Sequence, residues 1–138
     1  MAPKVFVVDD ETVIADTLTA ILNMSGYEAR AFYDGESALS ACEIGCPECV
    51  ISDVVMPGIN GLSMAMQIRQ RFPACKVLLF SGQAGTAAIL EAAGADGQGF
   101  EVLQKPVHPK DLLARLRALP LPAPEFDLST VDAPVVSL

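Results

Sequence analysis

Residues 5–11 of the chain read VFVVDDE, an apolar run of strand length that ends in acidic side chains. A continuous apolar run of this length is typical of a β-strand buried on both faces. Two later stretches repeat the arrangement, VISD at residues 50–53 and VLLFS at residues 77–81. Each places a polar side chain directly after apolar residues. The three stretches therefore predict buried parallel strands whose polar residues gather at one edge of a sheet.

The segments between these runs have the apolar spacing of amphipathic helices. Val13, Ile14, Leu18 and Leu22 form one such stripe, and Gly26 follows as a stop signal. The predicted strands span residues 5–8, 27–32, 50–53, 77–80 and 100–103, and the predicted helices span residues 13–22, 37–44, 62–72, 86–93 and 109–119. Five strand–helix repeats predict an α/β domain with a parallel sheet, helices on both faces and right-handed crossovers.

The composition of the chain argues against several classes of function. The chain has 138 residues, 17 acidic and 9 basic, so its formal net charge is −8, and 51% of its residues are apolar, enough to bury a core. The acidity argues against direct binding of nucleic acid, because phosphate backbones attract clustered Lys and Arg. It also argues against attachment to a membrane by basic charge. No apolar run approaches the roughly 20 residues that span a bilayer, and no signal peptide is evident. We therefore expect a cytoplasmic protein.

The regular pattern ends near residue 119. Residues 120–138 hold four of the ten prolines and three acidic residues, with no basic one. We therefore expect residues 1–119 to form one domain and residues 120–138 to form a flexible, Pro-rich acidic tail. Nothing after residue 119 has the length or basic charge of a helix-turn-helix domain, so we expect a domain that stands alone.

The four cysteines admit two interpretations. Cys42, Cys46 and Cys49 have the C-x3-C-x2-C spacing of enzymes that bind an iron–sulfur cluster and cleave S-adenosylmethionine. Such enzymes need a much larger barrel than this chain can form. Cys49 also opens an apolar run, which favours a small core residue. Without a secretory signal, the even count that includes Cys75 does not imply disulfides.

Polar side chains follow four of the predicted strands, at the edge where open parallel sheets bind ligands. They are Asp9, Asp10, Asp53, Ser81 and Lys105. Three neighbouring carboxylates repel one another and raise each other's pKa, and a hard divalent cation relieves that repulsion. Mg²⁺ prefers oxygen ligands and often joins carboxylates to phosphate oxygens. The pattern therefore indicates a Mg²⁺ site, which would also suit Mn²⁺.

The same residues favour phosphoryl transfer. Asp53 is a candidate nucleophile, because carboxylates can form aspartyl phosphates. Lys105 would add positive charge, and the Ser81 hydroxyl would donate a hydrogen bond to a phosphoryl oxygen. Singly, each residue also has a simpler interpretation as a helix cap, a turn residue or a solvated lysine. Their joint placement at strand ends favours a functional site.

Four motifs carry a resemblance to a known family. They are VVDDE at residues 7–11, ISDVVMPG at 51–58, LFSG at 79–82 and KP at 105–106. Together they resemble the receiver domain of bacterial two-component response regulators, over about residues 4–119. The resemblance implies a flavodoxin-like, doubly wound sheet of five parallel strands in the order 2-1-3-4-5. It also implies a cis peptide between Lys105 and Pro106, which a tight turn accommodates.

Roles of individual residues follow from this resemblance. Asp53 resembles the phosphoacceptor. Asp9 and Asp10 resemble the acidic pair that holds Mg²⁺, together with Asp53 and the backbone carbonyl of Val55. Ser81 resembles the switch hydroxyl, and Lys105 resembles the lysine that contacts the phosphoryl group.

One position departs from the family pattern. Receivers commonly carry Tyr or Phe three residues before the lysine, where this chain has Val102. Phe100 lies two residues earlier, and strand alternation places it on the same face as Val102. The preceding loop, residues 95–99, is unusually long and Gly-rich. We therefore hypothesise that switching uses Phe100 or a reordering of this loop.

The resemblance implies a phosphohistidine donor, either a sensor histidine kinase or a histidine phosphotransfer protein, and a downstream protein target. Such a domain catalyses only its own phosphorylation and dephosphorylation and is not an enzyme on an external substrate. One alternative is a degenerate receiver that only binds protein. Another is an aspartyl-phosphate phosphatase, which needs a general acid where this chain has Val55. A flavin-binding protein is a weaker alternative, because no hydroxyl-rich phosphate loop follows the first strand.

Overall fold

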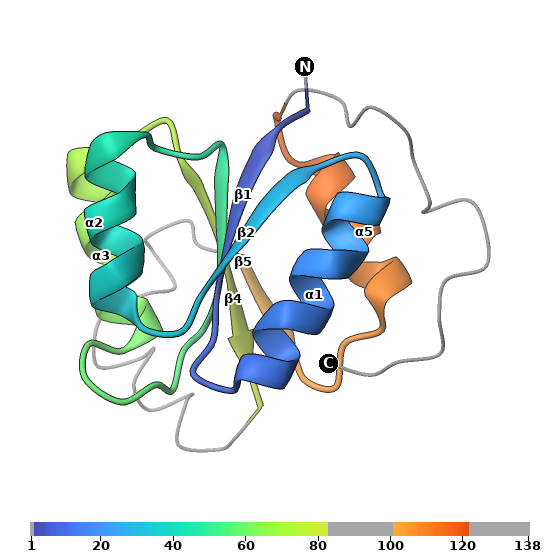
Figure 1. Ribbon diagram of the computed structural model, residues 1–138, viewed down its shortest axis with the longest axis horizontal. Coiled ribbons are helices and arrows are strands. Elements are labelled where there is room, and N and C mark those ends of the chain that lie inside the picture. The colour runs from blue at the N-terminus through green and yellow to red at the C-terminus, as the bar shows by residue number, and fades with distance from the viewer. Residues whose placement is uncertain (1, 83–100, 122–138) are drawn as a thin grey trace.

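The computed structural model describes residues 2–82 and 101–121 (Figure 1). In chain order, the elements are β1 (Lys4–Val8), α1 (Thr12–Met24), β2 (Glu28–Phe32), α2 (Gly35–Ile44), β3 (Cys49–Asp53), α3 (Gly61–Arg71), β4 (Lys76–Ser81), β5 (Glu101–Gln104) and α5 (Pro109–Ala118). The predicted strands and helices in the described part of the chain are present, with ends that shift by up to a few residues. The predicted helix at 86–93 and residues 122–138 of the predicted tail at 120–138 lie outside the described residues.

The strands form one parallel sheet in the order β2-β1-β3-β4-β5. This is the doubly wound, flavodoxin-like order that the motifs implied. The central strands β1 and β3 are buried almost throughout, which explains why their sequences are continuous apolar runs. Within residues 2–82 and 101–121, no helix is long and apolar enough to cross a bilayer.

Helices cover both faces of the sheet, with α1 and α5 on one side and α2 and α3 on the other (Figure 1). Side chains alternate along each strand, so successive residues enter different cores. In β1, Val5 and Val7 pack with Leu18 and Leu112, whereas Phe6 and Val8 enter the opposite core. Burial of the apolar stripes on both faces holds the sheet between its two helical layers.

Local polar contacts fix where the helices begin. The Asp34 carboxylate accepts a hydrogen bond from the Ser37 N–H at 2.7 Å and caps α2. The Asn60 side chain caps α3 in the same way through the Ser63 N–H at 2.8 Å. His108 caps α5, where its Nδ1 accepts from the Lys110 N–H at 3.1 Å. Each cap satisfies a backbone donor that the first turn of a helix leaves without a partner.

Candidate functional site

The predicted polar residues meet at the carboxyl edge of the sheet. Asp9 and Asp10 follow β1, Asp53 is the last residue of β3, Ser81 is the last residue of β4, and Lys105 follows β5. β1, β3, β4 and β5 are consecutive neighbours in the sheet. The parallel arrangement therefore brings to one edge residues that are far apart in the sequence.

Asp53 and Lys105 form an ion pair at the centre of this edge. The Lys105 Nζ donates to Asp53 Oδ2 at 2.9 Å, and the side chains are 14% (Asp53) and 20% (Lys105) exposed. The other carboxylate oxygen, Oδ1, accepts from the Val55 N–H at 3.3 Å. Both oxygens of Asp53 are thus oriented by the protein, while the group stays within reach of solvent.

Asp9 is the most buried of the three carboxylates, with 2% of the residue exposed. Its Oδ1 accepts from the Glu11 N–H at 2.9 Å, but its Oδ2 is buried with no partner among the described residues. Burial is the largest cause that raises the pKa of Asp9 to about 6. The hydrogen bond from Glu11 opposes this rise, and the negative charge of Asp53 adds to it. The expected mutual repulsion is therefore present, but burial has the larger effect on the pKa.

The three carboxylates are grouped closely enough to share a cation. One carboxylate oxygen from each of Asp9, Asp10 and Asp53 lies within 4.8 Å of the others, and Asp10 is exposed. A buried oxygen without a partner, a half-buried oxygen and an exposed one suit Mg²⁺, which takes oxygen ligands and keeps several waters. The chemistry of this donor set therefore fits the cation that the motifs implied.

The Lys105 side chain reaches the acidic group along the end of β4. Its backbone N–H donates to the Ser81 carbonyl at 2.9 Å, and its peptide bond to Pro106 is cis, as expected. A Cβ atom on Gly82 would lie 3.2 Å from both Cβ and Cδ of Lys105, so glycine leaves room for the lysine side chain. Burial tends to lower the pKa of Lys105, but the hydrogen bond and charge of Asp53, with the charges of Asp9 and Glu11, raise it overall.

Two residues that support Asp53 are absent from the sequence-based prediction. The buried Ser52 hydroxyl donates to the Asp53 carbonyl at 2.9 Å. A Cβ atom on Gly61, at the start of α3, would lie only 2.1 Å from that same carbonyl oxygen. The Gly61 N–H also donates to the Val54 carbonyl at 2.8 Å. An Asn-Gly pair such as Asn60-Gly61 is typical of a turn, but the close approach of Gly61 to β3 has no local signal in the sequence.

The predicted switch region is described only in part. Val102 lies in β5, opposite Leu79 of β4, and packs half-buried against the core beneath α2 and α3. Phe100 and the loop at residues 95–99 lie outside the described residues, and the switch hypothesis stays a prediction.

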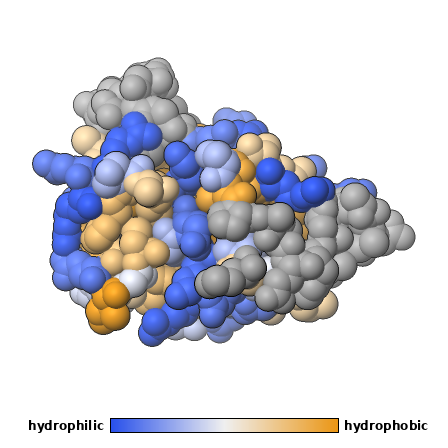
Figure 2. All heavy atoms as spheres, turned by 90° about the horizontal axis from the view of Figure 1, so that it is seen from above, coloured by the Kyte–Doolittle hydropathy of each residue, from blue (hydrophilic) through white to orange (hydrophobic). Residues whose placement is uncertain are grey.

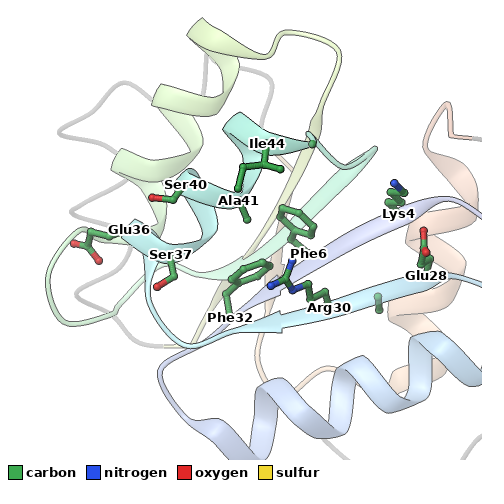
Figure 3. Close-up of a pocket in the computed structure, with 12 residues that line it drawn as sticks. Lys4, Phe6, Glu28, Arg30, Phe32, Glu36, Ser37, Ser40, Ala41 and Ile44 are labelled. Atoms are coloured by element: carbon green, nitrogen blue, oxygen red, sulfur yellow. The ribbon is translucent and has the colours of Figure 1, made fainter.

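A hollow on the surface lies away from the acidic edge. It measures about 850 Å³ and lies between α2 and strands β1 and β2 (Figure 3). Phe6 and Phe32 form its floor with ring centroids 4.7 Å apart, and the Arg30 guanidinium lies over the Phe32 ring at 5.0 Å. None of the predicted site residues lines this hollow. The charged groups and the carboxylate cluster therefore identify the candidate site, and this hollow lies apart from it.

Comparison with known proteins assigns the family. The family model of the response regulator receiver domain matches residues 5–117. The chain therefore belongs to the response regulator receiver domain family of two-component systems, as its motifs indicated. A solved response regulator receiver domain protein from Clostridium thermocellum is 28% identical and aligns with a TM-score of 0.76, over 86% of this chain and 93% of that one.

Curated relatives are longer than this chain. Response regulator MprA of Mycobacterium bovis is 30% identical over 86% of this chain and 51% of its own length. The DNA-binding response regulator MtrA of Mycobacterium tuberculosis is 31% identical over 86% of this chain and 50% of its own length. The chain thus spans about half the length of the curated relatives it matches, and DNA binding is a property of MtrA as named.

Proposed function

We propose that Asp53 accepts a phosphoryl group from a phosphohistidine donor in a Mg²⁺-dependent reaction, and that phosphorylation changes the binding of a downstream protein. The observation that carries this proposal is the placement of the Asp53 carboxylate, 2.9 Å from the Lys105 ammonium and grouped with Asp9 and Asp10. A carboxylate beside a cation site and a fixed positive charge is arranged for attack on phosphorus.

Receiver domains bind Mg²⁺ through an acidic pocket, and this chain has such a cluster of aspartates. In the proposal, Asp9, Asp10 and Asp53 hold Mg²⁺ or Mn²⁺ with the Val55 backbone carbonyl. When bound, the cation neutralises negative charge on the transferring phosphoryl group. The unpartnered Oδ2 of Asp9 supports this assignment, because a buried carboxylate oxygen without a donor is costly unless a cation faces it.

The residues of the chain have distinct tasks in this reaction. Asp53 attacks phosphorus through one carboxylate oxygen. Lys105, now paired with Asp53, stabilises charge on the phosphoryl oxygens once they arrive. Ser81 donates its hydroxyl hydrogen to a phosphoryl oxygen and links the modification to the end of β4. The domain acts on its own side chain, so we propose no turnover of an external substrate.

The partner in the proposal is a sensor histidine kinase or a histidine phosphotransfer protein. The edge that carries Asp53 is open to a macromolecular donor, because Asp10 and Val55 are exposed there. The predicted absence of direct nucleic-acid binding and the cytoplasmic location stay predictions.

A phosphatase acting on external phosphomonoesters is disfavoured by Val55. This residue occupies the position of the general acid in such enzymes, and its side chain carries no proton to transfer. Steady release of phosphate from a generic phosphomonoester by the wild-type chain would favour the phosphatase over the receiver.

The test is incubation of the chain with Mg²⁺ and acetyl phosphate, followed by intact-mass measurement. We expect a single phosphoryl adduct on wild type, none on Asp53→Asn, and an unchanged adduct on Asp16→Asn. Asp16 is a matched control, because it is an exposed aspartate of α1 that only accepts a hydrogen bond from the Tyr33 hydroxyl. Wild type that stays unmodified, or Asp53→Asn that is modified like wild type, contradicts the proposal.

A further inference from the structure

Three cysteine thiols gather at the end of the sheet opposite Asp53. Cys42 lies in α2, Cys46 lies in the loop between α2 and β3, and Cys75 directly precedes β4. β3 and β4 are neighbours, and the Lys76 N–H donates to the Glu48 carbonyl at 3.0 Å. The α2–β3 and α3–β4 loops therefore lie side by side, at the end of the sheet where β1 begins (Figure 1).

Cys46 is the centre of this group. It lies four residues after Cys42 and two residues before Glu48, whose carbonyl accepts from the N–H of the residue that follows Cys75. Cys46 is exposed, whereas Cys42 and Cys75 are 1% and 7% exposed and belong to the core beneath α2 and α3. Figure 2 views the molecule from this end and shows exposed apolar surface between hydrophilic side chains. A thiol that solvent reaches thus lies near two that the core shields.

The grouping differs from the one that the sequence spacing suggested. Cys49, the third cysteine of the C-x3-C-x2-C pattern, is fully buried in the opposite core, with Val5 and Leu78. It is a core residue, as its apolar surroundings predicted. Cys75 lies outside that pattern, but it lies near Cys46 in the fold, where Cys49 does not.

Of the two neighbours of Cys46, Cys75 is the better partner for a covalent bond. Cys42 is held within α2, where the Gly45 N–H closes the last turn on the Ala41 carbonyl at 3.0 Å. Cys75 lies in a loop and lines a small hollow beside Pro73. A loop residue can shift to reach disulfide geometry, whereas a residue within a helix has little freedom to do so.

We propose that Cys46 and Cys75 form a reversible disulfide by exchange with a low-molecular-weight disulfide. The Cys46 thiolate attacks one sulfur of the small disulfide, whose S–S bond breaks and releases one small thiolate. The Cys75 thiolate then attacks the Cys46 sulfur of the mixed disulfide and releases the second small thiolate. The two cysteines are oxidised, the small disulfide is reduced to two thiols, and these take up the two protons that the cysteines lose.

The surroundings make this exchange slow near neutral pH. Burial raises the pKa of the Cys46 thiol, and burial likewise raises that of Cys75. The thiols of Cys75 and Cys42 partly offset the rise in the pKa of Cys46, whereas the negative charge of Glu48 adds to it. Because the thiolate is the reacting species, the site responds to lasting oxidation and not to brief exposure.

The test treats the full chain with excess oxidised glutathione at about pH 8.5, where more thiolate is present. Remaining thiols are then alkylated, and the protein is digested with trypsin. A Cys46–Cys75 bond joins two tryptic peptides, residues 31–69 and 72–76. A Cys42–Cys46 bond would stay within the first peptide. We expect the joined pair, with the protein monomeric on a non-reducing gel.

Variants assign the order of the two steps. Cys46→Ser should show neither glutathione adduct nor bridge. Cys75→Ser should stop at the mixed disulfide, so that a glutathione adduct accumulates on Cys46. Cys49→Ala, a buried cysteine of the opposite core, and Cys42→Ala should both bridge within about twofold of the wild-type rate, since neither supplies a bonding sulfur.

Several results would overturn the assignment: a wild-type chain that stays fully reduced, a bond within residues 31–69, a disulfide between two molecules, or a glutathione adduct that accumulates without a bridge. Because Cys46 is exposed, the serine variant should fold, which circular dichroism checks. The outcome is independent of phosphorylation at Asp53, which lies at the other end of β3.

Discussion

At the scale of single residues, burial makes the negative charge of the Asp9 carboxylate unfavourable. Its pKa of about 6 in the folded protein lies above its ordinary value of 3.8, because the group is buried. Between these two pH values, the folded state binds more protons than the unfolded state. The free energy of unfolding of the metal-free protein therefore falls as the pH rises from about 4 to about 6.

Replacement of Asp9 tests this charge directly. Asp9→Asn should raise the free energy of unfolding by about 1–2 kcal/mol at neutral pH in the presence of a chelator, because the buried amide carries no charge. The gain should shrink as the pH falls from about 6 and vanish near pH 3, below both pKa values, where the wild-type carboxyl is protonated in both states. Urea unfolding across this range measures it. Asp10→Asn, at an exposed carboxylate, is the control and should change little. A gain that persists undiminished at pH 3 would refute the electrostatic explanation.

The environment of Lys105 also leads to a prediction about the rate of phosphorylation. Its ammonium contacts Asp53 directly, so Lys105→Met removes the fixed positive charge that faces the proposed nucleophile. We expect the rate of phosphorylation by acetyl phosphate to fall about 100-fold, as when one charge-stabilising donor is removed from an active site. Time-resolved intact-mass measurement gives the rate. Lys110→Met, at an exposed lysine of α5, should keep the wild-type rate. Equal rates for the two variants would remove Lys105 from the mechanism.

At the scale of elements, the junction between β3 and α3 holds Asp53 in place. Gly61→Ala would put a methyl group 2.1 Å from the Asp53 carbonyl oxygen, so the backbone must move. We expect a loss of stability of about 1–3 kcal/mol and slower phosphorylation of Asp53. Gly45→Ala is the matched control, because a Cβ atom there meets nothing within 4 Å. Chemical denaturation should separate the two variants, and equal stabilities would show that the close approach at Gly61 does not constrain the loop.

The elements also show what the sequence could and could not predict. Apolar runs located the strands, and strand ends located Asp9, Asp53 and Lys105, because burial on both faces imposes a readable pattern. Contacts between elements that are distant in the sequence could not be predicted from it. The 2.1 Å approach at Gly61 depends on how α3 meets β3. The proximity of Cys46 to Cys75 likewise depends on how two loops lie side by side, which no local spacing encodes.

At the scale of the whole molecule, Leu121 of the predicted tail lies against the core of the domain. Leu119 and Leu121 both pack, partly buried, against the core beneath α1 and α5. A chain that ends after residue 121 should therefore have the same stability as the full chain and accept a phosphoryl group at Asp53. A chain that ends after residue 118 should lose about 1–3 kcal/mol, because it gives up two apolar contacts. Thermal unfolding compares the three lengths. A large loss on removal of residues 122–138 alone would show that this segment belongs to the folded domain.

The central claim is that this sheet edge directs a phosphoryl group onto one carboxylate. Borohydride reduction after treatment with Mg²⁺ and acetyl phosphate tests it most directly, because it converts an aspartyl phosphate to homoserine at the modified position. We predict homoserine at residue 53, within the tryptic peptide 31–69, and none when Mg²⁺ is replaced by a chelator. Homoserine at Asp9 or Asp10, within the tryptic peptide 5–30, or no homoserine at all, would contradict the account.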